Sequence, residues 1–383
     1  MIIFALGFRP FFLLAGIFAV VLIGEWILAF VAGLGLANYY GAIGWHSHEM
    51  IFGFTGAVIA GFLLTAVRNW TEIPTAAGVR LAGLAGLWCA GRVIPFTGGI
   101  SQRWLIATVD LAFFPALAIA LSVPLLRKKE KRNLIFLALL AGLFAANLLI
   151  HLEMNGYTRN TARAGIFLGL HLIVLLIVVM GGRVIPFFTE RALQGFAPKR
   201  RLPMEWLSPL SVLAFLVTEL LLPDSIAGGV LSALAAVSNG VRLIGWYTKR
   251  IWSVPLLWVL HVGYAWIVAG FLLKALGSFG VVPPQFTIHA FTVGGIGVLT
   301  LGMMARVSLG HTGRPLRIST SMTLAFILIN LAAILRGIIP ILFQQWLPPL
   351  VALSGSLWIA AFTIFLGIFT PVLTQSRANG RPG

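Results

Sequence analysis

Long apolar stretches alternate with short polar, proline-rich or glycine-rich breaks along the whole chain. A helix that crosses a bilayer needs about 20 mostly apolar residues, and breaks of this kind mark helix ends. The pattern therefore predicts twelve membrane-spanning helices, with Pro223-Asp224 separating the seventh from the eighth. The expected bounds are residues 10–33, 46–67, 78–96, 103–126, 133–152, 164–186, 205–222, 225–245, 254–276, 285–305, 320–342 and 348–372.

Composition supports this prediction and excludes other classes of protein. The 383 residues are 59% hydrophobic and only 10% charged, against about 25% charged in a soluble domain. A mean hydropathy of +0.99 over the full length excludes a soluble or disordered chain, and a single cysteine, Cys89, excludes a disulfide scaffold. No linker or low-complexity run divides the sequence. We expect an all-α, polytopic integral membrane protein with one transmembrane domain over residues 1–383.

The formal net charge of +17 has two interpretations. In a soluble protein it would suggest nucleic-acid binding, whereas in a membrane protein basic residues collect in cytoplasmic loops. With the N-terminus placed inside, 21 of the 27 basic residues fall on the cytoplasmic side and six on the other. This bias predicts both termini in the cytoplasm and no nucleic-acid partner.

Seven histidines occur in this apolar chain, and five fall in the outer half of the predicted bilayer. Ionisable groups inside membrane helices are costly and usually functional. Imidazoles from four different helices, without a thiolate pair, are typical of a haem iron or copper centre. The alternative is that a lone membrane histidine only forms hydrogen bonds between helices. The outer five are His46, His48, His151, His171 and His289, whereas His261 lies in the inner half of the ninth helix and His311 in a predicted cytoplasmic loop.

We rank His48, His171 and His289 first as haem or metal ligands, then His46 and His151, with His261 as a separate candidate. Positions i and i+2 on a helix point about 200° apart. His46 and His48 can therefore meet one metal only if this stretch is extended. Otherwise His46 shares a face with Glu49 and His48 serves another partner, and the sequence leaves both possibilities open.

Several other polar residues near the outer side are candidates for roles beside a metal. Carboxylates there could deliver protons, and arginines could hold haem propionates. An equally strong alternative is that these carboxylates pair with arginines for structure alone. The catalytic candidates are Glu25, Glu49, Asp110 and Glu153, and the propionate candidates are Arg92 and Arg163.

Motifs along nearly the whole chain resemble the NnrS family. The resemblance implies a bacterial inner-membrane protein of about twelve helices that binds haem b and copper and acts in nitric oxide metabolism and nitrosative-stress resistance. The ligand types are also similar to those of haem-copper oxidases and nitric oxide reductases, although their sequence signature is absent. The motifs are FRPFF at 8–12, WHSHEMIFGF at 45–54, GFLLTAVRNWT at 61–71, GRVIPFFT at 182–189, HAFTVG at 289–294 and GMMARVSLGHTGRP at 302–315.

Three functions are compatible with these features. The first is an oxidoreductase that reduces nitric oxide at an outer-half haem with a second metal nearby, using an electron donor that the sequence does not identify. The second is a haem-based nitric oxide sink or sensor without turnover. The third and weakest is a transporter, suggested by twelve helices and by a GRVIPF sequence that occurs at 91–96 and 182–187, each copy expected at a helix end.

Overall fold

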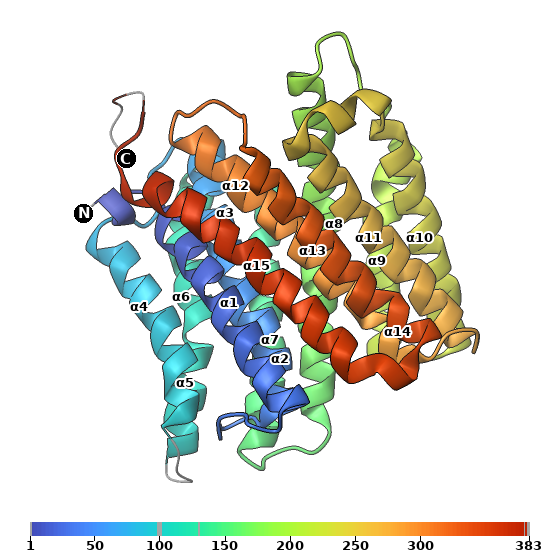
Figure 1. Ribbon diagram of the computed structural model, residues 1–383. Helices are drawn as coiled ribbons and strands as arrows, with labels where there is room; N and C mark the ends of the chain where they lie inside the picture. Colours follow the sequence, from blue (N-terminus) through green and yellow to red (C-terminus); the bar gives the residue numbers. More distant parts are fainter. Residues whose placement is uncertain (1, 98–101, 129–130, 379, 381–383) are drawn as a thin grey trace. The chain divides into compact units, whose positions relative to one another are not determined.

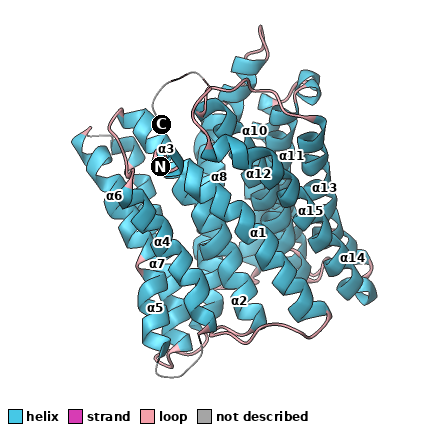
Figure 2. Ribbon diagram, turned by 60° about the vertical axis from the view of Figure 1, so that its left-hand side comes forward, coloured by secondary structure: helices cyan, strands magenta, loops and turns pink. Residues whose placement is uncertain are grey.

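The computed structural model describes residues 2–97, 102–128, 131–378 and 380. Helices joined by loops make up these ranges, and no strand occurs in them (Figure 2). Twelve helices are long and apolar enough to cross a membrane, which confirms the number and approximate bounds predicted from hydropathy. They span Phe8–Val31, Ala42–Thr71, Val79–Phe96, Arg103–Arg127, Ile135–Met154, Thr161–Ala192, Leu202–Leu221, Ile226–Trp246, Pro255–Ser278, Pro284–His311, Thr320–Leu342 and Gln344–Thr374.

The chain forms two compact units, which are described separately. Unit 1 contains Met1–Leu170, Val307–Pro315 and Phe365–Gly383, and unit 2 contains His171–Arg306 and Leu316–Ile364. Both the single transmembrane domain and the cytoplasmic placement of the two termini stay predictions.

Unit 1 is built around its second span, whose side chains are buried along most of its length. This span consists of α2 (Ala42–His48), the π-helix η2 (Glu49–Thr55) and α3 (Gly56–Thr71). Helix α1 packs against α3, and α6 packs against both α3 and α7 (Figure 1). The remaining helices of the unit are α1 (Phe8–Val31), α4 (Val79–Val93), α5 (Arg103–Leu111), α6 (Phe113–Arg127), α7 (Ile135–Met154) and the first residues of α8 (Thr161–Ala192).

Unit 2 places α10 between α9 and α11, and packs α11 and α13 against a second π-helix, η8. The break between α9 and α10 confirms the division expected at Pro223-Asp224. Asp224 adopts a positive φ of 56°, and the Ser225 side chain accepts a hydrogen bond from Gly228 N to cap α10. The elements are α8 from His171 onward, α9 (Leu202–Leu221), α10 (Ile226–Trp246), α11 (Pro255–Ser278), η8 (Ala290–Gly297), α12 (Val298–His311), α13 (Thr320–Gly337), α14 (Ile339–Leu342) and α15 (Leu347–Thr374). The last residues of α12 and of α15 belong to unit 1.

Two local expectations are wrong. The second GRVIPF copy, residues 182–187, does not end a helix, because α8 continues to Ala192. His311 is the last residue of α12 and not part of a loop; its ring lies 5.9 Å from that of Phe8, centre to centre. In both cases the helix continues past the residues at which we expected it to end. Packing inside the protein tolerates polar groups within a helix that contact with lipid would not.

Both π-helices begin directly after a histidine that the sequence singled out. Segment η2 follows His48, and η8 follows His289. A π-helix hydrogen-bonds from i to i+5, is uncommon, and occurs frequently at functional sites. Hydropathy predicted these stretches as helical but contains no signal for the wider turn.

Candidate metal centre

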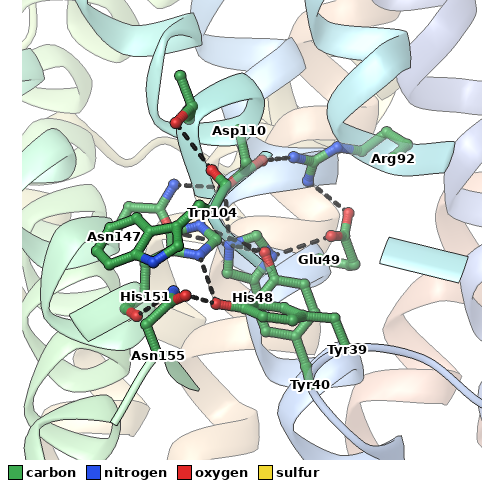
Figure 3. Close-up of polar contacts among 11 residues, drawn as sticks. Tyr39, Tyr40, His48, Glu49, Arg92, Trp104, Asp110, Asn147, His151 and Asn155 are labelled. Atoms are coloured by element: carbon green, nitrogen blue, oxygen red, sulfur yellow. Dashed lines mark hydrogen bonds and ion pairs between the residues drawn. The ribbon is translucent and has the colours of Figure 1, made fainter. Parts of the chain in front are cut away.

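A buried cluster of polar side chains lies among the helices of unit 1 (Figure 3). At its centre are His48 from α2, Asp110 from α5 and His151 from the last turn of α7. Each offers one possible ligand atom, and these three atoms all lie within 4.8 Å of one another. From the sequence we predicted His48 and His151 as haem or metal ligands and Asp110 as a catalytic carboxylate.

The spacing of the facing atoms fits one coordination shell. His48 Nε2 lies 3.2 Å from Asp110 Oδ2, and His151 Nε2 lies 3.1 Å from the same oxygen. Two ligands about 2.1 Å from one metal, at angles near those of a tetrahedral or octahedral site, are about 3.0–3.4 Å apart. The two imidazoles and the carboxylate could therefore bind one ion with small shifts.

The outer nitrogens of both rings have hydrogen-bonding partners that orient them. His48 Nδ1 is 3.0 Å from Glu49 Oε1, and His151 Nδ1 is 3.3 Å from the Tyr39 hydroxyl. Metal-binding histidines almost always hold their second nitrogen in this way, which fixes the tautomer and the direction of the ring. Both Nε2 atoms consequently face Asp110.

Arg92 of α4 connects the two carboxylates of the cluster. It forms ion pairs with Asp110 Oδ1 and, at 2.5 Å, with Glu49 Oε2. Gly53 leaves the space for this pairing, because a Cβ there would overlap the Glu49 carboxylate and the Arg92 guanidinium. Two carboxylates and one guanidinium leave a net charge of −1 if both histidines are neutral. A buried net charge is costly, so the cluster favours an added cation.

Both nitrogens of His48 face oxygen atoms. Nδ1 faces Glu49, while Nε2 faces Asp110 Oδ2 and, at 2.9 Å, Asn147 Oδ1. A neutral imidazole carries one proton, so it can donate to only one of these sides. The other side requires a second proton or a metal ion, and metal content distinguishes these two cases.

Sequence reasoning missed four polar residues of this cluster. Asn147 Nδ2 donates to Asp110 Oδ2 at 2.6 Å, and Asn155 Nδ2 donates to the Tyr39 hydroxyl at 2.9 Å. The Tyr40 ring stacks on His48 with centroids 4.2 Å apart, and its hydroxyl lies 3.2 Å from His48 Nε2. None of these four side chains is charged at neutral pH, and the two tyrosines lie in a loop. An amide one turn before His151 was a signal that could have identified Asn147.

Burial keeps the two tyrosine hydroxyls protonated. It raises the pKa of Tyr39 to about 12 and raises the pKa of Tyr40 well above its usual value. Both residues precede the second span, in the loop after α1. At neutral pH each can therefore donate a hydrogen bond toward the cluster.

The other residues predicted from unit 1 have different partners. The His46 ring stacks on Trp26 with centroids 4.1 Å apart, because α2 is helical there and turns His46 away from His48. The Glu25 carboxylate accepts a hydrogen bond from Leu36 N, and the Glu153 carboxylate accepts one from Ala162 N. The Arg163 guanidinium lies 5.5 Å from the Phe167 ring.

Three predicted histidines belong to unit 2. His171 on α8 is buried, and its ring packs edge-on against Phe215 and Phe291. His261 on α11 is buried, with Nδ1 3.0 Å from the carbonyl oxygen of Leu257. His289 directly precedes η8. Their convergence with His48 and His151 stays a prediction.

Unit 2 contains its own buried polar cluster around Arg242 of α10. The guanidinium pairs with Glu205 Oε2 at 2.9 Å and donates to the Tyr264 hydroxyl at 3.0 Å. Tyr264 in turn donates to Asn239 Oδ1. Gly182 makes room for this arginine, since a Cβ there would overlap the guanidinium. This cluster has one carboxylate and one guanidinium, so its charges balance.

The comparison with protein families identifies the chain. A family model described as NnrS protein matches residues 2–377. The comparison with curated proteins finds no match. The match covers every element of both units, including the residues of the candidate metal centre, and the twelve apolar helices agree with a multi-pass membrane protein. The chain therefore belongs to the NnrS family, and it is a membrane protein of nitric oxide metabolism.

Proposed function

We propose that this protein reduces nitric oxide at a redox-active metal, iron or copper, held by His48, Asp110 and His151. We also propose that it lies in the bacterial inner membrane with both termini in the cytoplasm. The observation that carries the first proposal is the approach of two imidazole Nε2 atoms to a single carboxylate oxygen, at 3.2 and 3.1 Å, inside a buried cluster with excess negative charge.

The donor set favours a metal that is not in a haem. Two imidazoles and one carboxylate are ligands that suit iron and copper. Asp110 Oδ2 lies against both Nε2 atoms, so there is no room for a porphyrin plane between the two rings. When bound, the metal would supply a site for the diatomic molecule and for electron transfer.

The surrounding side chains would orient the ligands and hold protons. Arg92 binds Asp110 Oδ1 and so directs Oδ2 toward the histidines. Glu49 fixes the ring of His48. The Tyr40 hydroxyl, 3.2 Å from His48 Nε2, could donate a hydrogen bond toward the centre, and Glu49, which is not one of the three ligands, could hold a proton. Nitric oxide reduction consumes protons, and burial of these side chains excludes bulk water from the centre.

A haem b would then be bound by other histidines, and we propose His171 and His289. Support comes from the family resemblance and from the apolar, aromatic surroundings of His171. The optical spectrum of purified protein tests this proposal: His171→Ala and His289→Ala should each lose the haem absorption, and retention in both variants would contradict the assignment.

Metal analysis of purified full-length protein tests the centre. Wild-type protein should retain about one iron or copper ion in addition to haem iron, whereas His48→Ala and His151→Ala should lose it. His46→Phe is the matched control, because it removes ring nitrogens two residues from His48 but preserves an aromatic ring against Trp26. A metal-free wild type after loading with either ion would overturn the proposed site.

Turnover is tested separately with the metal-loaded protein and a chemical electron donor. We expect nitric oxide to be consumed with formation of nitrous oxide, and this activity should be absent in His48→Ala. Nitric oxide binding without product would contradict the reductase and favour a nitric oxide sink.

A further inference from the structure

The start of α1, the end of α3, the loop after α12 and the segment after α15 lie at one end of unit 1, and each of these segments contains an arginine (Figure 1). Arg9 is in the first turn of α1, and Arg68 is in the last turn of α3. Arg314 directly follows α12, and Arg377 follows α15. None of these residues belongs to the candidate metal centre.

Hydrogen bonds connect three of these segments. Arg9 Nη1 donates to the carbonyl oxygens of Leu373 and Gln375 at 2.8 and 2.7 Å. Directly after Arg377, Ala378 N donates to Thr312 O at 2.9 Å. The start of α1, the end of α12 and the end of α15 are thereby held together.

Two packing contacts connect the start of α1 with α3 and with the end of α12. Gly7 lies so close to Leu64, one turn before Arg68, that a Cβ on Gly7 would overlap that side chain. The rings of Phe8 and His311 lie 5.9 Å apart. Charge repulsion from Arg314 and Arg377 acts on Arg9, which places the three guanidinium groups within electrostatic range of one another.

Acidic side chains are scarce in the described residues around this cluster. Asp224 is the last acidic residue in the sequence, and Glu25 is the first, so three of the four segments come from parts of the chain without any. The acidic residue next to the end of α3 is Glu72, whose side chain is 83% exposed and lies 3.7 Å from Lys128. Among the described residues, neither Arg314 nor Arg377 takes part in an ion pair.

Buried polar atoms in the cluster lack hydrogen-bond partners within the described part of the chain. These are Ser308 Oγ, which belongs to a fully buried side chain one turn before Thr312, Arg314 Nη1 and Arg377 Nε. Arginines near helix C-termini commonly hydrogen-bond the last carbonyl groups. Arg9 does so at the end of α15, where it donates to Leu373 O and Gln375 O. Capping accounts for Arg9 but leaves the donors of Arg314 and Arg377 without an acceptor.

We propose that the cluster of Arg9, Arg68, Arg314 and Arg377 binds a phosphate group. Guanidinium groups pair with phosphate through two parallel hydrogen bonds, and several of them suit a multiply charged oxyanion. A cluster at the ends of spanning helices lies at the depth of lipid headgroups, so the phosphate comes from an anionic phospholipid or from solution.

Binding of two probes to the purified full-length protein tests the proposal. Inorganic phosphate should raise the thermal unfolding midpoint in uncharged detergent more than chloride at equal ionic strength. Alternatively, phosphatidylglycerol should be retained in native mass spectra after incubation with vesicles of phosphatidylcholine and phosphatidylglycerol. Retention of the lipid without an effect of free phosphate identifies a headgroup site, and the reverse identifies a solution anion.

Variants separate this site from general surface charge. Arg314→Gln and Arg377→Gln should each weaken binding about tenfold, the loss expected for one charge-assisted hydrogen-bonding group. Arg317→Gln is the control, since Arg317 is an exposed arginine in the same loop. The proposal is overturned if neither probe binds better than its reference, or if Arg317→Gln reduces binding as much as Arg314→Gln. Metal content should be unchanged in all three.

Discussion

The Arg92 cluster of unit 1 and the Arg242 cluster of unit 2 both bury an arginine among membrane-spanning helices, but their charges add up differently. Arg92 faces two carboxylates, Glu49 and Asp110. Arg242 faces one, Glu205, and its other partners are neutral oxygens. The unit 2 cluster is complete without a ligand charge, whereas the unit 1 cluster requires one more positive charge. Charge balance, and not burial of polar groups as such, distinguishes the candidate metal centre.

Removal of the arginine should have the largest effect in both clusters. Arg92→Met and Arg242→Met should each lower the free energy of unfolding by about 3–5 kcal/mol, because a buried charge then loses its partner. Unfolding in mixed detergent micelles, followed by circular dichroism, measures this.

Double variants then separate the two clusters. In Glu205→Gln/Arg242→Met most of the stability should return, since no charge remains. In metal-free Glu49→Gln/Arg92→Met less of it should return, because Asp110 then has no positive partner except a second proton on His48. Equal recovery in both double variants would contradict the difference in charge balance.

Removal of a central carboxylate should lower the metal affinity of the protein in the unit 1 cluster but not in the unit 2 cluster. Asp110→Asn should weaken metal binding about 100-fold or more, since it exchanges a charged ligand for a neutral amide, and loss of even an outer-shell partner costs 10–100-fold. Glu205→Gln, the same kind of change in unit 2, should leave metal affinity unaltered. Metal titration of both purified variants provides the comparison, and a matching loss in Glu205→Gln would place the metal elsewhere.

A smaller effect is expected from a residue that orients a ligand. Glu49→Gln should weaken metal binding about tenfold by loosening the His48 ring, within the range for second-shell partners. The variant should still bind one ion, which metal analysis at saturating concentration can verify. Complete loss of the ion would instead make Glu49 a ligand.

The smallest effect concerns a neutral hydrogen bond in unit 2. Tyr264→Phe removes an acceptor for Arg242 and a donor to Asn239, and it should lower the free energy of unfolding by about 1 kcal/mol, as is usual for hydrogen bonds between membrane helices. Metal content and nitric oxide consumption should not change. A loss of either one would show that the unit 2 cluster contributes to the reaction.

Hydropathy predicted all twelve spans because a bilayer imposes the same length on every helix that crosses it. The wrong details have a different origin. His311 and the second GRVIPF copy are polar or proline-containing, and a single sequence does not distinguish a helix end from a helix that continues inside the protein. Tertiary packing decides such cases.

The candidate site was only partly predictable for a similar reason. Counting charged groups in apolar helices singled out His48, Asp110, His151, Glu49 and Arg92. Which of them meet depends on helix packing, so the pairing of Asp110 with both histidines could not be derived. Tyr40 was not predicted because it lies in a loop. Whether His46 and His48 face the same site depends on the conformation of α2, and its helical turn directs them to different partners.

The π-helix η2 lets the second span hold one residue more than an α-helix of the same length. Because the wider turn absorbs that residue locally, the faces of α2 and α3 keep their directions on either side of it. Deleting one residue between Met50 and Thr55 would convert the turn to α-helix and change these directions little. Deleting one residue of α3, which has no wider turn, would rotate the two sides of the deletion by about 100° relative to each other. His48 and Glu49 would then turn away from Asp110 and His151, although the hydropathy profile would hardly change.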